Sequence, residues 1–190
     1  MNMTNQSSTK SLAKVAEDRR WEFADQFGSG GFSEEALIKC IANLERIATM
    51  CFGSDAARGG FDLMVGQYFD EDTHNSGWRN ALDENFTSLY SDLPLGTLFH
   101  DLEAYADFGI VTTPATSAGE RETMLREQVE LGQQFVSLVP LEAWDLNAEH
   151  AVTVVGKAAV RWKLDTGQHI DAKELSLLSG LALQSIRTRL

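Results

Sequence analysis

Apolar residues recur along this chain at spacings of three and four, the period of one face of an α-helix. The clearest stripe follows Ser33, a favourable N-cap, and stops short of Gly53, a favourable helix end. Its members share one predicted face: Leu37, Ile41, Leu44, Ala48 and Cys51. The pattern predicts an amphipathic helix between Ser33 and Gly53.

Similar stripes predict further helices over residues 11–27, 55–69, 78–93, 95–108, 119–139 and 148–164. The pair Gly59–Gly60 predicts that the second of these begins after the glycines. The stretch 109–119 contains β-like residues, and Pro114 with its Ser and Thr neighbours predicts a loop or one short strand. The stripe over 119–139 is wide enough for two neighbours, in the same chain or in a partner copy. We therefore expect an all-α fold: a multi-helix bundle body with a C-terminal helix-turn-helix module.

Candidate catalytic and metal-binding residues are few. The sequence has no phosphate loop, no nucleophile elbow, no C-x-x-C and no dinucleotide fingerprint, so we expect no enzyme and no cofactor. The four histidines are scattered, and we expect no metal site. Cys40 and Cys51 lie eleven residues apart on one predicted helix, about 16 Å, too far for a disulfide. We expect both to be small buried thiols.

Acidic residues on the predicted helix 95–108 are expected to face solvent, because its apolar stripe takes the inward face. The polar residues in question are His100, Asp101, Glu103 and Asp107.

Charge divides the 190-residue chain unevenly, although its net charge is -12. Residues 1–150 carry 10 Lys and Arg against 25 Asp and Glu, whereas residues 151–190 carry 6 against 3. An acidic body repels nucleic acid, so any DNA contact is expected at the basic end. We expect a disordered lead-in over 1–10, an acidic helical body over 11–140 and a basic module over 147–190. No secretory signal or membrane span is predicted, which indicates a cytoplasmic protein.

The last twenty residues, DAKELSLLSGLALQSIRTRL, predict two short helices and a tight turn. Asp171 and Glu174 have the spacing of a capping box, and Gly180 can take the positive φ of a sharp turn. Leu181 is expected to plug the corner between the helices. Ile186 is expected to lie on the buried side of the second helix.

This stretch resembles the helix-turn-helix of bacterial and phage DNA-binding regulators. The resemblance rests on Ser176 in the first helix, Gly180 four residues later and Ile186 six residues after that, with serine where alanine is commoner. It implies that the second helix lies in the major groove of duplex DNA. The residues implied to contact DNA there are Gln184, Ser185, Arg187, Thr188 and Arg189. Basic residues nearby are implied to contact phosphates: Lys173, Lys157 and Arg161.

Two hypotheses of function follow. In the first, the chain is a sequence-specific DNA-binding regulator that acts as a homodimer, with an acidic body that dimerises or binds a protein partner. In the second, it is a non-enzymatic helical adaptor or assembly protein whose C-terminal hairpin packs or binds protein. The first requires Arg187 and Arg189, whereas the second requires Leu183 and Ile186.

Overall fold

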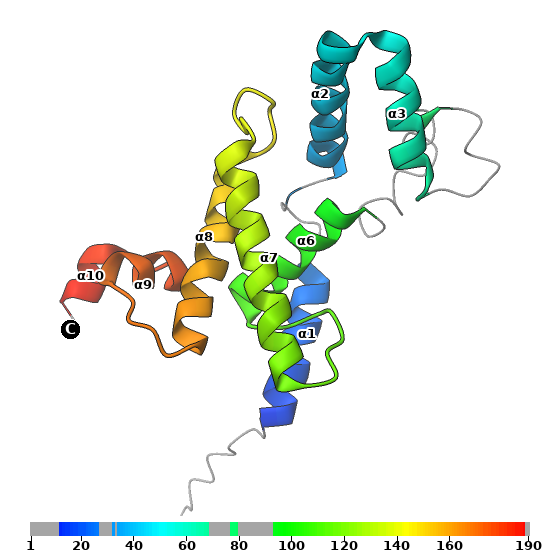
Figure 1. Ribbon diagram of the computed structural model, residues 1–190. Helices are drawn as coiled ribbons and strands as arrows, with labels where there is room; N and C mark the ends of the chain where they lie inside the picture. Colours follow the sequence, from blue (N-terminus) through cyan, green and yellow to red (C-terminus); the bar gives the residue numbers. More distant parts are fainter. Residues whose placement is uncertain (1–11, 27–31, 33, 69–76, 80–92, 189–190) are drawn as a thin grey trace, which may run out of the picture.

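The computed structural model describes residues 12–26, 32, 34–68, 77–79 and 93–188, and every regular element within these ranges is a helix (Figure 1). In chain order these elements are α1 (Leu12–Gln26), α2 (Glu34–Phe52), α3 (Ser54–Gly66), α6 (Pro94–Glu103), the π-helical η2 (Ala104–Phe108), α7 (Ala118–Leu138), α8 (Ala148–Asp165), α9 (Ala172–Ser179) and α10 (Leu183–Arg187). The all-α prediction is confirmed. In these ranges no helix has the length and apolar character needed to cross a bilayer. The expected lead-in over 1–10 and most of the expected helix over 78–93 lie outside the described residues.

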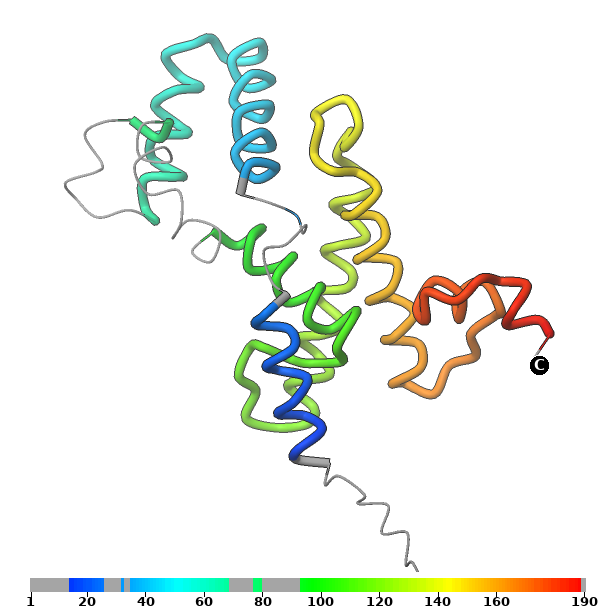
Figure 2. Tube along the Cα trace, turned by 180° about the vertical axis from the view of Figure 1, so that it is seen from behind, coloured from blue at the N-terminus to red at the C-terminus, as the bar shows by residue number. Residues whose placement is uncertain are grey.

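Helices α7 and α8 lie side by side at the centre of the molecule, and α6 with η2 packs against both (Figures 1 and 2). The buried side chains of α7 come from one half of its wide stripe, including Leu125 and Val129. The other half leaves Leu131 and Leu138 exposed. On α8, the buried residues Val154, Val155 and Ala158 complete the same core.

An aromatic cluster joins three parts of this core. Phe99 of α6 is fully buried and stacks on Phe32, with ring centroids 4.1 Å apart. Phe135 of α7 meets both rings edge-on. Such pairs add to the free energy gained by burial of the rings themselves.

Helices α2 and α3 form a hairpin that projects from one end of the molecule (Figure 1). Leu37 and Cys40 near its base are buried as expected, but Leu44 and Cys51 farther along the predicted stripe are exposed. The prediction of a buried thiol is therefore wrong for Cys51. A stripe is buried only where a neighbour covers it, and the outer turns of α2 extend beyond the central helices.

Helix α3 also corrects a prediction, because it begins at Ser54 and runs through Gly59 and Gly60. The two glycines weaken a helix by about 1 kcal/mol each relative to alanine. Burial of Phe61 and Val65 in the main core on the far side of the glycines offsets that cost.

Helix α1 packs on η2 through Phe23, which is buried beside Ala104 and Ile110. Ile110 lies near the start of the connection from Gly109 to Ser117. This connection contains no strand, so of the two predicted alternatives, a loop or a short strand, the structure shows the loop. Gly109 ends η2 in the left-handed conformation with φ 67°.

Two acidic residues of α6 are buried, although we expected them to face solvent. Asp101 accepts hydrogen bonds from Thr112 and Thr113 of the loop and from Gln128 of α7, whose Nε2 lies 2.6 Å from Oδ2. Burial tends to raise the pKa of Asp101, but these bonds and one with His100 outweigh it and hold the pKa below its usual value. The loop that folds over this face of α6 leaves no trace in the periodicity of α6 itself.

Glu103 is the second buried acid. Its Oε1 accepts a hydrogen bond from the Phe32 amide at 3.1 Å and lies 2.8 Å from Nε2 of His150. Phe32 and His150 lie far apart in the sequence, so Glu103 ties the segment before α2 to α8. The prediction of a solvated face holds only for Asp107, which is exposed.

Candidate nucleic-acid interface

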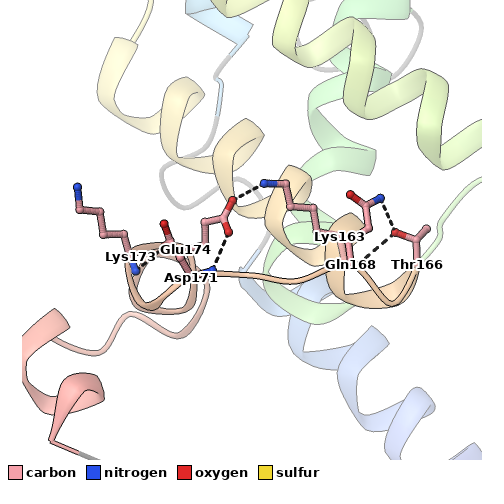
Figure 3. Close-up of polar contacts among 6 residues, drawn as sticks. All are labelled: Lys163, Thr166, Gln168, Asp171, Lys173 and Glu174. Carbon is pink, nitrogen blue, oxygen red and sulfur yellow. Dashed lines mark hydrogen bonds and ion pairs between the residues drawn. The ribbon is translucent and has the colours of Figure 1, made fainter. Parts of the chain in front are cut away.

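The start of α9 is held by a complete capping box, as the sequence predicts (Figure 3). Asp171 Oδ1 accepts from the amides of Lys173 and Glu174 at 2.7 and 2.8 Å, and Glu174 Oε2 accepts from the Asp171 amide at 2.9 Å. The backbone hydrogen bond at Glu174 lowers the pKa of Asp171. The cap fixes where α9 begins relative to the end of α8.

The turn after α9 has the conformation that Gly180 was expected to supply, with φ 69°. The Ser176 hydroxyl donates to the Leu181 carbonyl at 2.6 Å and so bridges the corner. Alanine, the commoner residue at this place in the motif, lacks this donor. Leu181 itself does not plug the corner, because 48% of it is exposed. The hydroxyl of Ser176 closes the turn that we assigned to the leucine.

Helix α10 shows one buried residue and a polar outer face. Ile186 is 4% exposed, as predicted, whereas Gln184, Ser185 and Arg187 are exposed. Thr188 is the C-cap of α10 and its hydroxyl donates to the Gln184 carbonyl at 2.8 Å. Arg189 lies outside the described residues. The structure therefore brings four of the five predicted groove residues to one short, exposed segment.

Close packing and an ion pair attach α9 to α8. A side chain on Gly156 of α8 would come within 3.0 Å of Leu177 Cδ2, which shows how closely the helices approach. Lys163 of α8 forms an ion pair with Glu174 of α9 (Figure 3). The hydrogen bond from Lys163 lowers the pKa of Glu174. Figure 1 shows α9 and α10 on the side of α8 away from α1, and no residue of α9 is fully buried.

Two of the predicted phosphate contacts, Lys157 and Arg161, bond to η2, whereas Lys163 on the same helix pairs with α9. Lys157 Nζ is 2.6 Å from Asp107 Oδ1, and Arg161 Nε donates to the Ala106 carbonyl at 3.1 Å. Both bonds anchor α8 to η2. We therefore remove these two residues from the candidate interface. They entered it because a sequence shows that a basic residue is near a motif but not which neighbour it faces.

The same observation corrects the expected domain boundary near residues 140–147. Helix α8, which we placed in the module, supplies Val154, Val155 and Ala158 to the core of the body. No residue of α9 or α10 belongs to that core.

Ion pairs neutralise part of the positive charge of residues 151–190. Lys157 pairs with Asp107, and Lys163 with Glu174. Within the described part of α9 and α10, Lys173 and Arg187 are balanced by Asp171 and Glu174. Among the described residues of this surface, two exposed side chains per copy can attract phosphate, those of Lys173 and Arg187.

Sequence reasoning missed a pocket that lies between α1, the loop 110–115 and the start of α7. Its lining combines one continuous loop with residues of α1 that lie about ninety positions earlier in the sequence, so no local motif could have revealed it. Over the ranges that the structure describes, no three His, Cys, Asp or Glu side chains are grouped as metal ligands. Comparison with family models, curated proteins and solved structures finds no match for this chain.

Proposed function

We propose that α9 and α10 form a helix-turn-helix that binds duplex DNA, and that the chain acts as a dimeric regulator of transcription. The observation that carries the proposal is the display of Gln184, Ser185 and Arg187 on α10, anchored through Ile186 and held at a glycine turn. A side-chain amide can bond adenine bidentately, and a guanidinium can bond guanine or phosphate. Thr188 continues this surface.

A dimer is part of the proposal because α9 and α10 are short. One copy offers few contacts, and a second copy placed about 34 Å away on the duplex doubles them. Lys173 and Arg187 are the proposed phosphate contacts. With two contacts per copy, the logarithm of affinity falls against the logarithm of salt with a slope of about -1.8 for one copy and about -3.6 for two.

Fluorescence anisotropy with labelled random duplex tests this directly. Between about 50 and 200 mM salt, those slopes predict a loss of affinity of about tenfold for a monomer and about a hundredfold for a dimer. Arg187→Ala is expected to weaken binding by about 1–3 kcal/mol. Arg58→Ala is the matched control, because Arg58 is also exposed but lies on α3. Absence of binding at the lower salt, or equal loss in both variants, contradicts the proposal.

A second candidate function is favoured by the α2–α3 hairpin. Six large apolar side chains of the hairpin are exposed: Leu44, Ile47, Met50, Phe52, Leu63 and Met64. Exposed apolar side chains gathered on neighbouring helices are typical of protein interaction sites. In this alternative the chain is an assembly protein that joins a second copy through the hairpin, because an apolar face can match its own copy about a twofold axis. The hairpin α9–α10 then serves for packing alone.

Light scattering after size exclusion tests the second candidate. The double variant Met50→Glu and Phe52→Glu is expected to be monomeric, since both side chains are 75% exposed in one copy. Leu138→Glu, an 80% exposed position on α7, is the matched comparison and is expected to leave the dimer intact. Dissociation by Leu138→Glu instead places the interface on α7. A monomeric parent protein contradicts both the assembly function and the dimeric part of the first proposal.

A further inference from the structure

The pocket between α1 and α7 contains two arginines that come from different helices. Its volume is about 520 Å³, within the range of pockets that hold small molecules. Arg20 of α1 and Arg121 of the first turns of α7 line it, together with Phe23, Ile110 and Pro114. In the described part of the chain, no carboxylate pairs with either guanidinium. The pocket therefore combines two uncommitted cations with an apolar wall.

Hydrogen bonds to α6 fix the loop that forms one wall of the pocket. Thr112 and Thr113 line the pocket, and their hydroxyl groups donate hydrogen bonds to the buried carboxylate of Asp101. Gln128 of α7 donates to the same carboxylate, so the loop is tied to both α6 and α7. On the opposite side, Phe23 is fixed by ring contacts with His100 and Phe108, at 5.0 and 5.5 Å between centroids. A wall of this kind exists before any ligand arrives, which lowers the entropy cost of binding.

We propose that this pocket binds a small organic anion with an apolar body. The guanidinium groups of Arg20 and Arg121 hold its carboxylate or phosphate, since a planar fork of donors matches the oxygens of either group. Phe23, Ile110 and Pro114 cover its apolar part. The site uses no residue of α9 or α10, so the inference goes beyond DNA binding and stands or falls independently of it.

A series of contacts joins the pocket to the C-terminal helices. Loop 110–115 and α1 both rest on η2, and η2 is bonded to α8 through Lys157 and Arg161. Helix α8 in turn carries α9 through Lys163.

Isothermal titration calorimetry with simple probes tests the site. Phenylacetate and phenyl phosphate supply the two anionic groups on one apolar ring, and phenylacetamide is the neutral match. We expect at least one of the two anions to bind with a Kd at or below about 1 mM, and phenylacetamide to bind at least about tenfold more weakly. Inorganic phosphate is expected to bind more weakly than phenyl phosphate, because it leaves the apolar wall uncovered.

Variants of the two arginines test whether the anion binds in this pocket. Arg20→Gln and Arg121→Gln are each expected to raise the Kd of the anion that binds by about tenfold. Arg126→Gln, also exposed on α7 but outside the pocket, is the control and is expected to leave it unchanged. All three positions are exposed, so the variants are expected to keep the parent's thermal unfolding.

Three results overturn the proposal: no heat from either anion, equal binding of phenylacetamide, or an equal loss in Arg126→Gln. DNA affinity of the same variants is measured in parallel. Loss of anion binding with intact DNA binding separates this site from the proposed function.

Discussion

Gly132 of α7 lies where side chains of α6 and α8 pack closely against its backbone. A methyl group there would lie 2.7 Å from Cδ1 of Leu102 on α6 and 3.2 Å from Cγ2 of Val155 on α8. Leu102 and Val155 are 1% and 3% exposed, so neither side chain has solvent to move into. The substitution Gly132→Ala therefore tests whether α6, α7 and α8 meet as the structure shows.

Two opposing terms set the expected magnitude. Replacing glycine by alanine inside a helix stabilises the protein by about 1 kcal/mol. Forcing an extra methyl group into a filled core costs about 1–3 kcal/mol. Gly132→Ala is therefore expected to lower the free energy of unfolding by roughly 0–2 kcal/mol. Gly59→Ala on α3 has only the first term, because no atom lies within 4 Å of the added methyl group.

The assay is urea unfolding followed by far-UV circular dichroism. The informative quantity is the difference between the two variants, expected to be about 1–3 kcal/mol in favour of Gly59→Ala. Adding Leu102→Ala to Gly132→Ala makes room for the methyl group. The cost of the two changes together is then expected to be less than the sum of their separate costs. If Gly132→Ala stabilises the protein as much as Gly59→Ala does, the three helices do not approach as described.

The remaining predictions concern the aromatic cluster, a buried carboxylate and the two thiols. Phe99→Ala is expected to lower the free energy of unfolding by about 3–5 kcal/mol, because a fully buried ring is lost. Urea unfolding measures this change, and a loss below about 1 kcal/mol contradicts the packing. Because folding lowers the pKa of Asp101, its contribution to stability is present above the ordinary pKa of 3.8 and is lost as pH falls through the lower folded value. Asp101→Asn is therefore expected to be less stable than the parent at neutral pH and to lose less stability on acidification, and identical acid unfolding curves contradict this. Cys51 is expected to react with iodoacetamide far faster than Cys40, since Cys51 is exposed whereas burial raises the pKa of Cys40 to about 11. Peptide mapping after brief labelling measures both rates, and equal labelling contradicts the assigned burial.

Local signals in the sequence determined most helix ends correctly. Asp171 with Glu174 predicted the start of α9, and Gly180 predicted the turn after it. These features depend on backbone conformation and on hydrogen bonds between near neighbours, which residues a few positions apart decide by themselves. The same reasoning identified Ile186 as buried, since the side of a short helix opposite its polar residues must face its support.

The tertiary structure alone decided what each side chain faces. Asp101 is buried because a loop eleven residues away folds over it, and Lys157 is paired because η2 lies against α8. Cys51 is exposed because, among the described elements, none covers its face of α2. The pocket lined by Arg20 and Arg121 joins residues a hundred positions apart. Periodicity describes one helix at a time, whereas burial, ion pairing and pockets depend on which helices meet, and that is set by the packing of the whole core.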